Sequence, residues 1–105
     1  MRHSDGRKAT NLSQQARPIL RGRSRVTLVQ LELMQHVATM QNITAAGREL
    51  GMSGSLAARQ IASLERALGV RLFQRTTRSI RLTEAGERVL DWARQTLEGF
   101  TELDD

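Results

Sequence analysis

The chain has 105 residues, enough for one small domain with a modest core, and its 16 basic and 11 acidic side chains give a formal net charge of +5. It contains no cysteine, which excludes disulfides, thiolate metal sites and a cysteine nucleophile. No apolar run reaches the ~18–20 residues of a membrane span, and the first residues lack the apolar core of a signal peptide. We therefore expect a cytoplasmic protein. The two histidines, His3 and His36, are far apart and indicate no metal site.

The charge is unevenly distributed along the chain. Residues 1–25 carry seven basic and one acidic side chain, residues 26–81 seven basic and three acidic, and residues 82–105 two basic and seven acidic. Positive charge concentrated in one part of a protein indicates an anionic partner, most commonly nucleic acid.

Residues 1–25 combine Gly, Ser, Asn, Gln and scattered Arg without helical or strand periodicity. This composition predicts a disordered basic arm, which would add sequence-independent attraction to phosphates. The alternative is that the arm is extraneous, either vector sequence or the result of a start codon assigned too far upstream.

Regular structure is expected to begin at "VTLVQLELMQHVATMQ". Thr27 followed by Gln30 fits a capping box, and a helix is predicted over about 28–41, ending at Asn42. One buried stripe is expected on this helix, made of Leu31, Met34, Val37 and Ala38.

Two further helices are expected on either side of a short turn that contains glycine. Thr44 is the expected N-cap of the first, and Gly51 its left-handed stop. Ser53 is the expected N-cap of the second, which runs over about 54–68. The expected core positions of the two helices are Ala45, Ala46, Leu50, Ala57, Ile61, Leu64 and Leu68. This arrangement predicts a helix-turn-helix at about 43–62, with a plain three-helix bundle as the alternative.

The outer face of the helix over 54–68 carries unusually small side chains at Gly54, Ser55 and Ala58, beside Arg59. A solvated helix usually has longer polar residues at such positions. Small residues let a helix lie deep in a major groove about 12 Å wide. The free N–H groups of its first turn, with the Ser53 cap, would also suit a phosphate. We therefore expect this face to contact DNA.

The next segment, "VRLFQRTTRSIRLT", changes to short alternating runs around Phe73 and Ile80. It predicts a two-stranded hairpin with Arg75 and Arg78 near its tip. A hairpin in this position after a helix-turn-helix is a wing.

A last helix is expected from Glu84 onward, capped by Thr83 and with acidic residues in its first turn, where they favour the helix dipole. Its long apolar stripe consists of Ala85, Val89, Ala93, Leu97, Phe100 and Leu103, with Leu90 and Trp92 beside it. Such a stripe exceeds what a small domain covers, so the same helix of a second copy is the expected partner.

The segments "TAAGREL", "LGVRLFQRTTR" and "LTEAGE" and the Ser-x-Ser…Ile-x-x-Leu-Glu pattern resemble the N-terminal domain of LysR-type transcriptional regulators from about Val26 to the end of the chain. The resemblance implies a mainly α fold, a winged helix-turn-helix followed by a linker helix that pairs two subunits on a dyad DNA site. It divides the chain into an arm (1–25), a DNA-binding domain (26–83) and a dimerisation helix (84–105).

The resemblance also implies site residues. The DNA-binding positions would be Thr44, Ser53, Gly54, Ser55, Ala58, Arg59, Arg75, Thr77 and Arg78, with Thr44 on the DNA backbone and the last three on the wing. The dimerisation positions would be Val89, Trp92, Ala93, Leu97 and Phe100. Many members have Gln where this chain has Gly54, and most have Ser where it has Ala58. Base readout is therefore expected to depend on Arg59 and Ser55, supplemented by thymine-methyl contact or DNA shape.

The family's effector-binding domain has no counterpart in these 105 residues. A DNA-binding fragment or truncated gene product is the expectation, with an autonomous short regulator as the alternative. The predicted function is sequence-specific binding of double-stranded DNA by a homodimer, without metal, cofactor, membrane or catalysis, and with a small-molecule effector only if a further domain exists. The alternatives are a sequence-independent DNA binder and an interaction module that forms mixed dimers with a full-length regulator.

Overall fold

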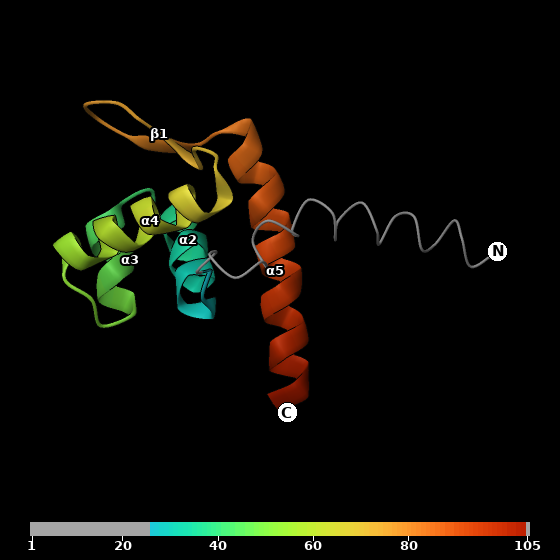
Figure 1. Cartoon of the computed structure of the whole chain (residues 1–105). Helices are drawn as coiled ribbons and strands as arrows, with labels where there is room; N and C mark the ends of the chain where they lie inside the picture. The colour runs from blue at the N-terminus through green and yellow to red at the C-terminus, as the bar shows by residue number, and fades with distance from the viewer. Residues whose placement is uncertain (1–25, 105) are drawn as a thin grey trace.

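The computed structural model describes residues 26–104, with side chains over 26–100, so the predicted arm at 1–25 lies outside the described residues. Helices pack around a central helix, a two-stranded sheet lies to one side, and a long helix closes the chain (Figure 1). The elements are α2 (Leu28–Met40), α3 (Ile43–Glu49), α4 (Gly54–Leu68), β1 (Phe73–Arg75), β2 (Ile80–Leu82) and α5 (Glu84–Asp104).

Helix α2 is the centre of the fold. Its capping box is confirmed: the Thr27 hydroxyl accepts the Gln30 N–H at 3.1 Å, and the Gln30 side chain accepts the Thr27 N–H at 3.1 Å. The predicted buried stripe is present but broader than expected: Leu31, Met34 and Val37 are buried and Ala38 is half-buried, while Gln30 and Leu33 widen the same face. The helix packs against α3, α4 and α5, which together cover this wide face.

The start of α3 corrects one prediction. Asn42, and not Thr44, is the N-cap: its side-chain oxygen accepts the N–H of Ala45 at 2.8 Å. Gln41 ends α2 in the left-handed conformation with φ of 55°, which lets the chain turn at once into the new helix. Thr44 therefore lies inside the first turn of α3, and its hydroxyl is not used for capping.

The bounds of α4 match those predicted. Ser53 caps the helix by accepting the Leu56 N–H at 3.1 Å, and Gly69 ends it with φ of 72°. Ala57, Ile61 and Leu64 are fully buried beneath α2 and α3, while Leu68 is half-buried.

The predicted hairpin and its connection to α5 are also present. The strands pair antiparallel with Phe73 opposite Leu82. Thr83 caps α5 by accepting the Gly86 N–H at 2.8 Å, and its own hydroxyl donates to the Arg71 carbonyl at 2.6 Å. The wing and the start of α5 are thereby joined.

Helix α5 lies alongside α2 and continues past it in Figure 1. Leu90 and Ala93 are buried in the core shared with α2, and Trp92 and Leu97 pack against its edge. The domain therefore covers part of the apolar stripe that the sequence assigns to a second copy.

Candidate nucleic-acid interface

The turn between α3 and α4 is held by close backbone packing. The N–H of Met52 donates to the carbonyl of Gly47 at 2.8 Å, and Gly51 has φ of 75°. A Cβ at Gly47 would lie 2.7 Å from that of Ala57, so only glycine fits this contact without a shift. The two helices are fixed relative to each other, as a helix-turn-helix requires.

The leading face of α4 presents the predicted small residues together with one long cation. Ser53, Ser55 and Arg59 are exposed, while Gly54 and Ala58 are half-buried. This end of the helix carries no acidic residue in its first turn. Its unpaired N–H groups and the Arg59 guanidinium therefore make the end of the helix attractive to an anion.

Gly54 has a reason to be small that the sequence did not reveal. A Cβ built on it would lie 2.8 Å from Oγ1 and 3.2 Å from Cγ2 of Thr44. The side chain of Thr44, which projects from α3, thus occupies the space that a side chain at 54 would need. The expectation that this position is small only because DNA approaches it is incomplete.

The wing presents the predicted residues Arg75, Thr77 and Arg78, all exposed. Its tip is organised by Thr76, which the sequence analysis missed. The Thr76 hydroxyl accepts the N–H groups of Ser79 at 3.0 Å and Arg78 at 3.2 Å. A threonine opening a tight hairpin is a weak signal, and its role is clear only from the folded loop.

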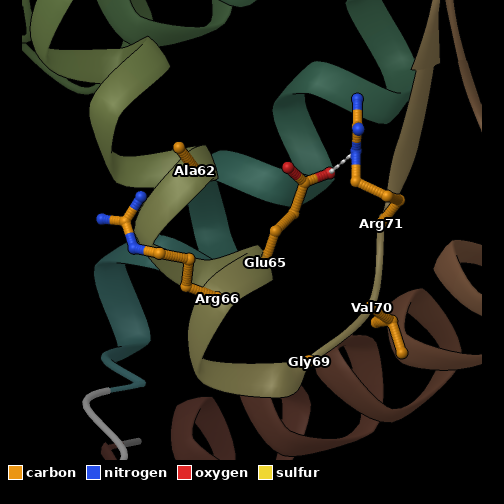
Figure 2. Close-up of a pocket in the computed structure, with 6 residues that line it drawn as sticks. All are labelled: Ala62, Glu65, Arg66, Gly69, Val70 and Arg71. Carbon is orange, nitrogen blue, oxygen red and sulfur yellow. Dashed lines mark ion pairs between the residues drawn. The ribbon is translucent and has the colours of Figure 1, made fainter.

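Glu65 is the second residue that the sequence analysis missed. It projects from α4, and one carboxylate oxygen accepts the N–H of Leu72 at 2.8 Å and that of Phe73 at 3.3 Å. Its side chain is only 12 % exposed, whereas that of its ion-pair partner Arg71, 3.8 Å away, is 71 % exposed (Figure 2). Glu65 therefore ties the helix that carries Arg59 to the strand that begins the wing.

The basic side chains between residues 26 and 81 are all arginines and all exposed: Arg48, Arg59, Arg66, Arg71, Arg75, Arg78 and Arg81. They come from α3, α4 and the wing. In Figure 1, α3 and the wing tip lie on the side of α2 away from α5, and α4 begins on that side and crosses in front of α2. The charged side chains of α5 are mostly acidic, six against two basic. The positive charge is therefore concentrated around α4 and the wing, where the surface suits a polyanion.

The predicted dimerisation residues of α5 separate into two groups. Ala93 is fully buried within its own chain and therefore cannot be part of an outer contact surface as predicted. Val89, Trp92 and Leu97 are half-buried, and Phe100 is 55 % exposed. Phe100, Leu97 and Leu28 line part of a cavity of about 590 Å³ between α2 and α5.

Residues 26–104 hold no cluster of three or more potential metal-ligating side chains. Within the same residues, no helix combines the length and the apolarity needed to cross a bilayer.

A family model described as the bacterial regulatory helix-turn-helix protein, lysR family, matches residues 28–87. The chain belongs to the LysR family. The match extends from the first residue of α2 into the first turn of α5, so it includes both helices of the helix-turn-helix and the wing.

Curated transcriptional regulators are similar in sequence to this LysR-family chain. The HTH-type transcriptional regulator DmlR of Escherichia coli is 37 % identical over 75 residues, which are 71 % of this chain and 24 % of DmlR. TfdS of Cupriavidus pinatubonensis is 43 % identical over 76 residues, 71 % of this chain and 26 % of TfdS. The chain thus spans about a quarter of the length of these relatives.

A solved complex of the CbnR DNA-binding domain with DNA is similar in structure to the LysR-family chain. It superposes with a TM-score of 0.72 at 38 % identity and covers 76 % of this chain and 92 % of that one. The C206 mutant of Corynebacterium glutamicum OxyR gives a TM-score of 0.72 at 32 % identity, over 78 % of this chain and 26 % of that one.

Proposed function

We propose that this LysR-family chain binds double-stranded DNA and takes part in regulating transcription. The observation that carries the proposal is the similarity to the CbnR DNA-binding domain, nearly all of which is covered and which was solved with DNA. The exposed arginines on α3, α4 and the wing supply the charge for such a partner. In this proposal the chain is a DNA-binding protein and not an enzyme. It would act in the cytoplasm, where bacterial DNA is found.

In this proposal α4 enters the major groove with its first turn leading. Arg59 and Ser55 are the exposed groups that hydrogen-bond to base edges or phosphates, and Ala58 offers a methyl contact to thymine. Ser53 places the free N–H groups of the first turn against a phosphate.

The wing would contact the backbone or minor groove beside the major-groove site. Arg75 lies at the end of β1, and Arg78 and Thr77 lie in the loop that the Thr76 hydroxyl organises. Neutralising phosphates releases counterions, so these arginines would contribute salt-dependent affinity rather than sequence preference.

A homodimer through α5 would bring two such domains onto one dyad site. Val89, Trp92, Leu97 and Phe100 are the partly or largely exposed apolar residues available for this contact, and Ala93 is not among them. Two-fold symmetry then predicts half-sites about 34–36 Å, or a multiple of that distance, apart.

The test is fluorescence-anisotropy binding to the DNA upstream of the chain's own gene and to a scrambled duplex of equal length, at two salt concentrations. A tenfold or larger preference for the upstream DNA, about 1.4 kcal/mol, supports sequence-specific binding. Equal and steeply salt-dependent affinities support the sequence-independent alternative, which the small leading face of α4 favours. An absence of binding to either duplex would contradict the proposal.

The interaction-module alternative is tested separately. A pull-down with a full-length regulator of the same family would detect mixed dimers, and their formation without DNA binding by this chain would favour that alternative.

A further inference from the structure

A cavity of about 590 Å³ lies between α2 and α5, and its lining residues are distinct from those proposed to contact DNA. They come from α2 and from the second half of α5: Leu28, Glu32, Gln35, His36, Arg94, Leu97, Glu98 and Phe100. The apolar part of the lining is open to water, since the Phe100 side chain is 55 % exposed and Leu28 and Leu97 are only half-buried. Open apolar surface around a cavity indicates that another group binds there.

Two carboxylates line this cavity without a cationic partner. Glu32 and Glu98 are exposed, and among the side chains described, over residues 26–100, neither forms an ion pair. Arg94 is the one basic residue of the lining, so the cavity carries two negative charges against one positive when His36 is neutral. An occupant that combines apolar and positively charged side chains would therefore complement it.

The segment "RPILR", residues 17–21, has this composition. Ile19 and Leu20 are the only two adjacent large apolar residues in the first 25 residues of the chain, and Arg17 and Arg21 flank them. Basic side chains outnumber acidic ones seven to one over residues 1–25. The segment therefore offers apolar groups for the lining and cations for the two carboxylates.

The place of this segment in the chain lets it reach the cavity. Only residues 21–25 separate Leu20 from Val26, and Leu28 already lines the cavity. The stretch from Leu20 to Val26 can span about 20 Å when extended. The cavity positions on α2 lie within about 12 Å of Leu28, at a rise of about 1.5 Å per residue. Gly22 lies within the connecting stretch, and glycine accommodates a reversal of the chain.

Tethering favours this segment over the other candidate occupant, α5 of a second copy. A short connection gives a tethered group an effective concentration in the millimolar range. A second copy present at about 10 μM is then roughly a hundredfold less concentrated.

We propose that residues 17–21 dock in the cavity between α2 and α5 of their own chain, with the isoleucine and leucine on the apolar lining and the arginines facing the two carboxylates. Leu97 and Phe100 also belong to the proposed dimerisation surface, so the docked segment and α5 of a second copy exclude one another. The arm thereby limits dimerisation. This consequence rests on the proposed homodimer, whereas the docking does not.

A spin label in the full chain tests the docking. The chain contains no cysteine, so Gln15→Cys provides a single labelling site beside the segment. In nitrogen-15 NMR spectra the label should broaden the amide signals of the cavity residues and leave those of α4 and the wing sharp. Unlabelled nitrogen-15 chains mixed with spin-labelled chains should show no such broadening, because the docking is within one chain.

Matched variants test which side chains dock. Ile19→Asp combined with Leu20→Asp should abolish the broadening. Asn11→Asp combined with Leu12→Asp introduces the same charge elsewhere in the arm and should preserve it. On α5, Glu98→Lys should weaken the broadening, while Glu87→Lys, outside the cavity lining, should not.

Sedimentation velocity measures the competition with dimerisation. If the segment covers the cavity about two-thirds of the time, a dimer that needs both cavities open forms about ninefold less readily. The Ile19→Asp and Leu20→Asp variant should therefore dimerise about tenfold more tightly than wild type, and the control at positions 11 and 12 should not.

The outcomes separate the docking from the proposed function. If the label leaves the cavity signals sharp, or broadens them only in the mixed sample, the inference is wrong while DNA binding and the homodimer stand. Equal dimerisation of all variants would overturn the competition. If wild type binds no DNA, the proposed function fails, and broadening at the cavity would still support the docking.

Discussion

Replacing Glu65 with alanine should destabilise the domain by an amount that the hydrogen-bond geometry allows us to estimate. The carboxylate accepts two N–H groups, at 2.8 and 3.3 Å, from residues that are themselves 0 % and 1 % exposed, Leu72 and Phe73. A hydrogen bond to a charged group contributes about 1.5–3 kcal/mol, and the longer bond contributes less than the shorter one. We expect a loss of about 2–3 kcal/mol in the free energy of unfolding.

Thermal unfolding followed by circular dichroism measures this loss. A domain of this size loses roughly 4–8 °C in Tm per kcal/mol, so Glu65→Ala should lower the Tm by about 10–20 °C. Glu65→Gln keeps an acceptor oxygen but no charge, and should cost about half as much.

The control is Arg71→Ala, which removes the other partner of the carboxylate. That ion pair is 3.8 Å long and the arginine side chain is 71 % exposed, so its loss should cost less than about 1 kcal/mol. If Arg71→Ala destabilises the domain as much as Glu65→Ala, the reasoning is refuted, because the ion pair and not the backbone contact would then be the source of stability.

Three other predictions concern the wing and α5. Gly86→Ala should lower the free energy of unfolding by more than about 2 kcal/mol, because the added Cβ would collide with the Leu72 carbonyl. Gly99→Ala should raise the free energy of unfolding by about 0.5–1 kcal/mol, because the space around Gly99 is open. Chemical denaturation measures both changes. Arg75→Ala should weaken binding to all duplexes and reduce the slope of log K against log salt by about one unit, and a change of base preference at a single position would contradict its assignment to the backbone. If the proposed homodimer forms through α5, Phe100→Glu should convert it to a monomer in sedimentation velocity and leave the Tm of the monomer unchanged, because the ring is 55 % exposed in the single chain.

Helices whose ends are marked by capping residues could be predicted from the sequence. The bounds of α4 were predicted because Ser53 and Gly69 each act within one helical turn of the helix they delimit. The start of α3 was missed because Asn42 and Thr44 are both good caps, and only the left-handed turn at Gln41 selects the first of them.

The contacts that the sequence could not reveal form only where the folded chain brings separate segments together. Glu65 reaches backbone groups seven and eight residues away, and backbone N–H groups leave no mark on a sequence pattern. The burial of Ala93 was missed for a related reason: the helical period defines a stripe, but the angle at which α5 packs on α2 determines where the core ends.

The attachment of α5 to the rest of the domain determines which parts of this helix unfold locally and which unfold only with the whole domain. Thr83 joins the helix start to the segment that precedes β1, and Leu90 and Ala93 lie in the core. Amide hydrogens in the first half of α5 should therefore exchange with solvent only when the whole domain unfolds, while those in its last turns should exchange through local fraying. The domain boundary between residues 83 and 84 that the sequence suggests would then lie inside a single cooperatively unfolding unit. That unit would end within α5, beyond Ala93.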